Sequence, residues 1–104
     1  MAFADNLKKM PGVAHVEAIR LLDGEEEVGV IEHKPGQVGA LVLYNHLGQT
    51  YGAITPEAAR AGLDLYAEQV EDARASPGKH PAVDRLIEIA AGGRTLRVKH
   101  VFFA

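Results

Sequence analysis

The chain has 104 residues, of which 47% are hydrophobic and 24% are charged, and this composition predicts a single globular domain over residues 1–104. The formal net charge of −3 argues against nucleic acid as the main partner, because a phosphate backbone requires a basic protein face. No stretch approaches the roughly 18 apolar residues of a membrane span, and the N-terminal residues lack the hydrophobic core of a signal peptide, so we expect a cytoplasmic protein that binds no membrane.

The first third of the chain predicts a short helix followed by a β-hairpin. Residues 3–10 (FADNLKKM) can form two helical turns, which the Pro-Gly pair after them would end. Residues 14–22 and 28–34 are rich in aliphatic and β-branched side chains, and Asp23-Gly24 lies between them. An Asp-Gly pair between two such runs is typical of a hairpin turn, so the two runs are expected to pair as antiparallel strands.

Two long helices are predicted after the hairpin. Residues 37–52 repeat apolar side chains at helical spacing, with Asn45 on the opposite, polar face. A strand is the alternative for residues 39–44. Residues 55–75 form the clearest helical pattern of the chain, and Thr55 can cap its N-terminus.

The remainder of the chain predicts a third helix and a final strand. The helical pattern after Pro81 places Asp84, Arg85 and Glu88 on the solvent face. Residues 95–103 (TLRVKHVFF) begin with the alternation of a strand. Since only the N-terminal hairpin offers edges for this strand, the predicted fold class is α+β. We expect a small antiparallel sheet, made of the hairpin and the C-terminal strand, packed against about three helices.

Several classes of active site lack the residues they require. The chain has no cysteine, which excludes disulfides, thiolate metal sites and thiol nucleophiles. Ser76 is the only serine and precedes a proline, outside any nucleophile-elbow motif. The five histidines are not at the spacing of a metal-binding motif, and no complete phosphate-loop motif is present. We therefore expect no metal ligands and no cofactor.

Two Gly/Pro turns hold the most informative polar residues. The segments EHKPGQVG (32–39) and ASPGKHPAVD (75–84) each place a His–Lys pair just before a predicted helix N-terminus. Free backbone N–H groups and the helix dipole make such positions receptive to anions, and the adjacent glycines allow close approach. The alternative is two structural corners with solvated lysines, and a joint site requires that both turns lie on one concave surface. The candidate site for a small anionic ligand consists of His33, Lys34, Gly36, Gly78, Lys79 and His80.

The same histidines support an alternative function. Either His33 or His80 would act as a general base, with Glu32 or Asp84 as the orienting carboxylate. Nothing in the sequence places an imidazole beside a substrate, so we expect a non-catalytic binding or protein-interaction module rather than an enzyme. A subunit that acts only through its strand edge or helix surface is a third reading.

The C-terminus predicts an assembly surface. In a strand, Phe102 and Phe103 point to opposite faces, whereas the helices cover only one face of a three-stranded sheet. An unpaired terminal strand also invites pairing with a second copy. We therefore expect a homodimer that uses the C-terminal strand through Val101, Phe102 and Phe103. The alternative is a monomer in which residues 101–104 pack beneath the N-terminal helix.

Three segments carry a resemblance to a known family: HKPG, LYNHLGQTYGAI and GLDLYAEQVEDARASPGKHPAVDRL. In this order they resemble a small bacterial family of similar length that is catalogued only as a domain of unknown function. The similarity covers most of the chain, and LYAEQVEDARASPGKHPAVDRL is its most specific part. The resemblance implies a compact cytoplasmic protein of bacteria, and it supplies no activity, ligand or catalytic residue.

Overall fold

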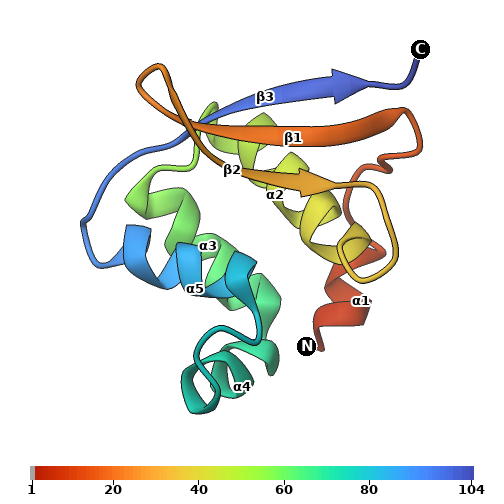
Figure 1. Cartoon of the computed structure of the whole chain (residues 1–104). Coiled ribbons are helices and arrows are strands. Elements are labelled where there is room, and N and C mark those ends of the chain that lie inside the picture. Colours follow the sequence, from red (N-terminus) through yellow and green to blue (C-terminus); the bar gives the residue numbers. More distant parts are fainter. Residues whose placement is uncertain (1) are drawn as a thin grey trace.

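The computed structural model describes residues 2–104, which form five helices and three strands (Figure 1). The predicted α+β class is confirmed, and so is the sheet built from a hairpin and the C-terminal strand. There are more helices than the three expected, because the helix predicted over 55–75 is divided and the N-terminal helix is separate. None of the described helices is long and apolar enough to span a membrane. The elements in chain order are α1 (Phe3–Leu7), β1 (Val16–Asp23), β2 (Glu26–Glu32), α2 (Val38–Tyr51), α3 (Pro56–Tyr66), α4 (Gln69–Ala75), α5 (Pro81–Ala90) and β3 (Arg97–Phe102).

Strand β1 is the centre of the sheet and pairs antiparallel with both β2 and β3, which gives the order β2-β1-β3. Ile19 of β1 lies between Ile31 on β2 and His100 on β3. The hairpin turn contains Gly24, whose φ of 63° suits the first loop position of a type II′ turn. Because β1 has a neighbour on each side, β2 and β3 each leave one edge unpaired within residues 2–104.

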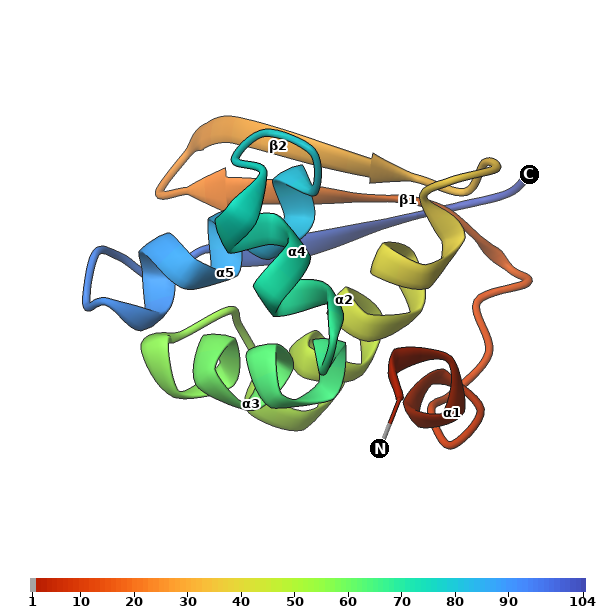
Figure 2. The same cartoon turned by 90° about the horizontal axis from the view of Figure 1, so that it is seen from below.

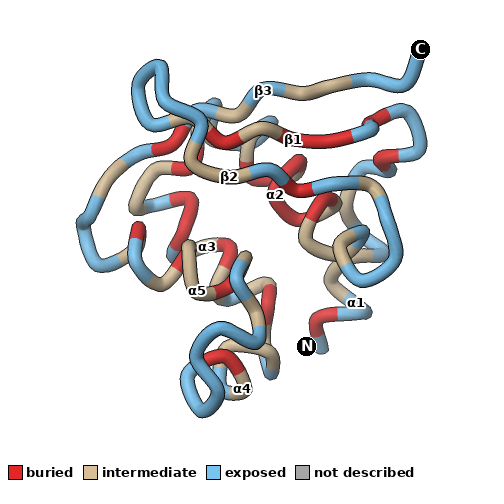
Figure 3. Tube along the Cα trace, viewed as in Figure 1, coloured by how far each residue is buried: buried red, intermediate tan, exposed pale blue. Residues whose placement is uncertain are grey.

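All five helices lie on one side of the sheet, as the views in Figures 1 and 2 show. Helix α2 packs against the sheet with Leu41, Tyr44 and Leu47 fully buried, and Figure 3 shows buried residues concentrated along β1 and α2. The polar face predicted for this helix is wrong at Asn45, which is 1% exposed. Its Oδ1 lies 2.7 Å from Nε2 of His100, so this polar contact joins α2 to β3 inside the molecule.

The helix predicted over residues 55–75 is interrupted at Ala67. This residue has φ 53° and ψ −120°, and it is the only non-glycine residue with a positive φ in the described part of the chain. Such angles are those of the first loop residue of a type II′ turn, a position that favours glycine. The turn ends α3 at Tyr66 and begins α4 at Gln69, and both of these residues line the cleft described below.

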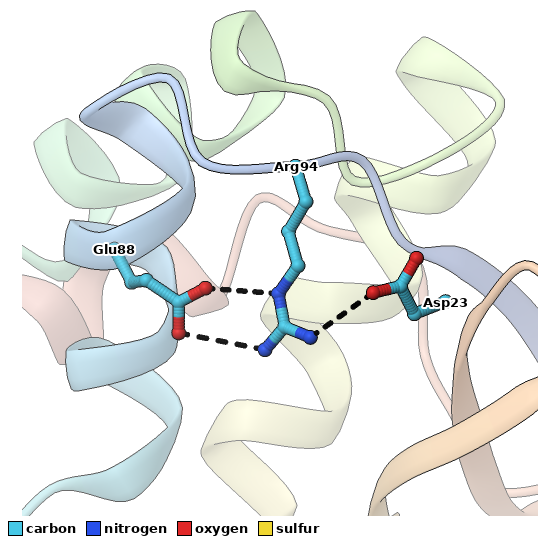
Figure 4. A network of polar contacts seen from close by, with 3 residues as sticks. All are labelled: Asp23, Glu88 and Arg94. Carbon is cyan, nitrogen blue, oxygen red and sulfur yellow. Dashed lines mark hydrogen bonds and ion pairs between the residues drawn. The ribbon is translucent and has the colours of Figure 1, made fainter.

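Arg94 fixes the connection between α5 and β3 (Figure 4). Its Nε donates to Glu88 Oε2 at 2.8 Å, and its Nη1 donates to Asp23 Oδ2 at 3.3 Å. The hydrogen bond to Glu88 and then that to Asp23 raise the pKa of the guanidinium. The end of α5 is thereby joined to the end of β1, and the charge of Arg94 is balanced within the chain.

Candidate ligand-binding cleft

A cleft lies between strand β2 and the helices. Its volume is about 670 Å³, and residues of β2, of all five helices and of two connecting turns line it. The turn before α2 contributes Gly36 and Gln37, and the turn before α5 contributes Lys79 and His80. The two Gly/Pro turns singled out in the sequence therefore lie on one concave surface, which is the arrangement that a shared site requires.

The turn before α2 is held by contacts within itself. Gln37 Oε1 accepts the backbone N–H of Glu32 at 2.9 Å, and Lys34 Nζ lies 2.6 Å from Glu32 Oε2. Gly36 has a φ of 87°, a conformation that glycine adopts without steric cost. Of these residues, Gly36 and Gln37 line the cleft and the Lys34–Glu32 pair does not.

His33 also lies outside the lining of the cleft. Its Nδ1 is 2.9 Å from the carbonyl oxygen of Val16, and its ring centroid is 5.7 Å from that of Phe103. Glu32, proposed as its orienting carboxylate, is paired with Lys34 instead. The His33–Glu32 pair is therefore not formed, and His33 joins the turn to β1 and to the C-terminus.

Lys79 and His80 share one carboxylate of α4. Lys79 Nζ lies 3.1 Å and His80 Nε2 lies 2.6 Å from Oδ2 of Asp72. The hydrogen bonds from His80 and then from Lys79 lower the pKa of Asp72. Both side chains are thereby held beside the cleft by a residue that the sequence did not single out.

Asp84, the carboxylate predicted to orient His80, has a different role. Its Oδ2 accepts the backbone N–H of Gly78 at 2.9 Å, which closes the loop onto the first turn of α5. Gly78 has a φ of 90° and does not line the cleft. The predicted His80–Asp84 pair is corrected to His80–Asp72, because α4 rather than the first turn of α5 brings a carboxylate to the imidazole.

Arg85 is the cleft residue whose position was predicted wrongly from the sequence. Predicted to face solvent, it is partly buried and lines the cleft. A Cβ on Gly29 of β2 would lie 2.6 Å from Nη2 of Arg85, so the absent side chain of Gly29 leaves the space that the guanidinium occupies. Burial raises the pKa of Tyr44, and the charge of Arg85 opposes that rise. No carboxylate of residues 2–104 lies within ion-pair distance of Arg85.

Phe3 and Tyr66 form an aromatic wall of the cleft. Their ring centroids are 4.8 Å apart and their planes differ by 16°. The backbone N–H of Phe3 donates to Glu68 Oε1 at 2.9 Å, and a Cβ on Gly39 of α2 would lie only 3.1 Å from the Phe3 ring. Tyr66 is 2% exposed, and its hydroxyl has no hydrogen-bond partner among the described residues. Burial raises the pKa of this hydroxyl.

The lining of the cleft is cationic although the chain is acidic. Lys79, His80 and Arg85 line it, whereas none of its described lining residues is Asp or Glu, in a chain of net charge −3. Charge-assisted hydrogen bonds from such residues suit carboxylate and phosphate groups. No group of three or more His, Cys, Asp and Glu side chains that could hold a metal ion occurs in the part of the chain that the structure describes.

Comparison with family models relates the chain to other bacterial proteins. The model described as "Uncharacterized protein conserved in bacteria (DUF2322)" matches residues 3–100. The chain belongs to this family. The matched range includes every residue that lines the cleft, and it confirms the resemblance seen in the sequence. Searches of curated proteins and of solved structures gave no match.

Proposed function

We propose that the protein is a non-catalytic binding module of the bacterial cytoplasm that holds a small anionic ligand in the cleft. The observation that carries this proposal is the environment of Arg85. Arg85 is partly buried, lines the cleft and has no carboxylate within ion-pair distance in residues 2–104. Removing a charged group from water without an opposite charge costs free energy, and the hydroxyl of Tyr44, which interacts with Arg85, is neutral. A ligand anion would supply the missing negative charge.

The residues predicted from the two turns take unequal parts in this proposal. Lys79 and His80 add positive charge to the cleft, but both are held by Asp72. Arg85 has no such competitor, so we assign the anionic group of the ligand to Arg85 first. Three of the predicted residues do not line the cleft and support the shape of the turns: His33, Lys34 and Gly78.

Thermal unfolding in phosphate tests the proposal. At matched ionic strength, we expect phosphate to raise the Tm of the native chain more than that of Arg85→Gln. Arg94→Gln is the matched control, since two carboxylates already bind that guanidinium, and it should keep the native response. A ligand at about 100 times its Kd adds about 2.7 kcal/mol when it binds only the folded state. Because anions such as phosphate also stabilise proteins by exclusion from the surface, equal shifts in all three proteins would contradict the proposal.

A catalytic role for His80 is the second candidate function. The 2.6 Å contact between His80 Nε2 and Asp72 Oδ2 favours it, because a carboxylate that orients an imidazole is the usual support of a general base. Binding is favoured instead because Lys79 shares the same oxygen and no Ser, Thr or Cys side chain lines the described cleft.

A hydrolysis screen separates these two functions. Ester, amide and phosphomonoester substrates are offered to the native chain and to His80→Gln. Turnover that is present in the native chain and absent in the variant would establish catalysis. We expect no His80-dependent turnover with any of the three substrate classes.

We also propose that two copies associate through β3. This strand lies at the edge of the sheet, and Phe102 and Phe103 are 58% and 51% exposed, beside a partly buried Val101. The C-terminus lies apart from α1 in both views (Figures 1 and 2), and the Phe103 N–H donates to the His15 carbonyl at 3.1 Å. Packing beneath the N-terminal helix is therefore not the arrangement adopted. Pairing of two β3 edges would satisfy free backbone groups and reduce the exposure of both rings.

Light scattering on the native chain and on Phe103→Lys tests this assembly. We expect a native dimer and a monomeric variant, because a lysine at the edge disfavours strand pairing. Val38→Lys is the control, since Val38 is also exposed but lies on α2. A native chain that stays monomeric at high micromolar concentration would exclude the dimer.

A further inference from the structure

The cleft is larger than an inorganic anion requires. Its volume of about 670 Å³ falls within the range of small-molecule sites, which is about 300–1,000 Å³. Most of the residues that line it are apolar, and they come from both the sheet and the helices. A ligand that fills the cleft must therefore bring an apolar body in addition to its anionic group.

Val38, at the start of α2, indicates where that body would lie. Val38 is 37% exposed and is one of the four exposed large hydrophobic side chains in residues 2–104. It lines the cleft, as does the stacked pair of Phe3 and Tyr66, which are 9% and 2% exposed. Exposed apolar surface in a concave site of this volume is typical of a small-molecule groove.

The charges around the cleft suit a monoanion. Asp72 offsets the charge of Lys79 and also contacts His80, whereas Arg85 has no carboxylate at ion-pair distance in the described chain. The planar fork of a guanidinium matches the two oxygens of a carboxylate. A carboxylate bears one negative charge at neutral pH, while a phosphate monoester bears roughly −1.5 to −2. One unbalanced cation therefore favours the carboxylate.

We infer that the ligand of the cleft is a monocarboxylate with an apolar body, an inference that rests on the anion-binding function proposed above. The carboxylate binds the guanidinium of Arg85. The apolar body lies against Val38, next to the buried Phe3–Tyr66 pair. Lys79 stays with Asp72 at the margin of the site.

Calorimetric titration with four probes tests each part of this assignment: 2-naphthoate, acetate, 2-naphthamide and 2-naphthyl phosphate. We expect 2-naphthoate to bind about 100-fold more tightly than acetate, because its ring system removes apolar surface from water. It should bind about tenfold more tightly than 2-naphthamide, which cannot form a charge-assisted pair with Arg85. It should also bind more tightly than 2-naphthyl phosphate, whose second charge has no free cation.

Three variants assign these differences to the residues named. Arg85→Gln should weaken 2-naphthoate about tenfold, because the charge-assisted pair is lost, and Arg94→Gln should leave its affinity unchanged. Val38→Ser should weaken 2-naphthoate without changing the affinity for acetate, because only the apolar body contacts this side chain. The folded state of each variant is checked by its thermal unfolding.

The outcomes separate this inference from the function on which it rests. If phosphate and acetate bind through Arg85 but 2-naphthoate binds no more tightly than acetate, anion binding stands and the apolar monocarboxylate is overturned. Tighter binding of 2-naphthyl phosphate than of 2-naphthoate overturns the monoanion. If no probe depends on Arg85, both proposals fail.

Discussion

Arg94 and Arg85 are both partly buried beside the sheet, but only Arg94 has its charge balanced inside the chain. Arg94 is bound by Glu88 and Asp23 (Figure 4) and joins α5 to the hairpin. Arg85 lies against Gly29, and no carboxylate of residues 2–104 is at ion-pair distance. An arginine side chain therefore joins two elements of the fold at position 94, whereas at position 85 it leaves a positive charge available in the cleft.

Two other energetically unfavourable features of the folded chain lie beside the cleft. The hydroxyl of Tyr66 is buried without a hydrogen-bond partner among the described residues. Ala67, the next residue, adopts a backbone conformation that favours glycine. Strain and unsatisfied groups concentrated in one place are typical of functional sites. These features lie beside the cleft that Arg85 lines and therefore support its assignment as the site.

The largest expected effect comes from filling the space beside Arg85. A Cβ at Gly29 would lie 2.6 Å from Nη2 and 3.1 Å from Cζ of Arg85, so Gly29→Val should displace the guanidinium. We expect the affinity for 2-naphthoate to fall at least about tenfold, because the charge-assisted pair can no longer form. The Tm should change little, because the displaced group is the end of a flexible side chain. Calorimetric titration and thermal unfolding measure the two quantities.

Gly12→Val is the control for this substitution, since a Cβ at Gly12 would meet no atom within 4 Å. It should leave the affinity unchanged. Native affinity in Gly29→Val would mean that the position of Arg85 beside β2 has no part in binding.

The next effect separates the two arginines by their contribution to stability. Arg94→Met removes a guanidinium shared by two carboxylates and should lower the free energy of unfolding, by the small amount typical of exposed pairs. Arg85→Met breaks no ion pair and removes a poorly compensated charge, so it should leave stability unchanged or raise it. Urea unfolding of both variants gives the comparison. Equal losses would assign Arg85 a structural role like that of Arg94.

A smaller effect follows from the carboxylate that neutralises the rim of the cleft. Hydrogen bonds from His80 and then Lys79 lower the pKa of Asp72 in the folded chain. The ionised carboxylate therefore stabilises the fold at neutral pH, and this contribution is lost as the pH falls through the lowered pKa. The native chain should be more stable than Asp72→Asn at neutral pH, and the difference should shrink below about pH 4. Urea unfolding over a pH series measures it.

The same variant also changes the charge of the cleft. Asp72→Asn leaves Lys79 without its carboxylate, as Arg85 is in the native chain, so 2-naphthyl phosphate should bind more tightly to the variant. A stability difference that is independent of pH would show that Asp72 acts through something other than its charge.

Local patterns are sufficient to predict most of the fold, because the signals lie within each element. Asp23-Gly24 locates the hairpin turn, and alternation locates β3. The break at Ala67 could not be predicted, since neither glycine nor proline marks it and the apolar repeat continues across it. The burial of Asn45 also depends on a distant partner, His100 of β3.

The candidate site, like the fold, could be predicted only in part from local sequence patterns. Turn signals lead to Gly36, Lys79 and His80, which do line the cleft. Arg85 could not be placed, because its position depends on β2 passing beside α5, and the available signal was a glycine within a strand, at Gly29. Nearness in sequence misassigned Asp84 as the partner of His80, a contact that only the packing of α4 decides.

The smallest effect tests the backbone cost beside the cleft. Ala67 has φ 53° and ψ −120°, and a non-glycine residue in a sparsely populated region costs about 1–3 kcal/mol. Ala67→Gly relieves that strain but adds freedom to the unfolded chain, which offsets about 0.4–1 kcal/mol. We expect a net gain of about 0.5 kcal/mol in the free energy of unfolding. Ala61→Gly, within α3, is the matched control and should lose about 1 kcal/mol. Equal losses at both positions in urea unfolding would show that Ala67 carries no backbone strain where it ends α3 beside Tyr66.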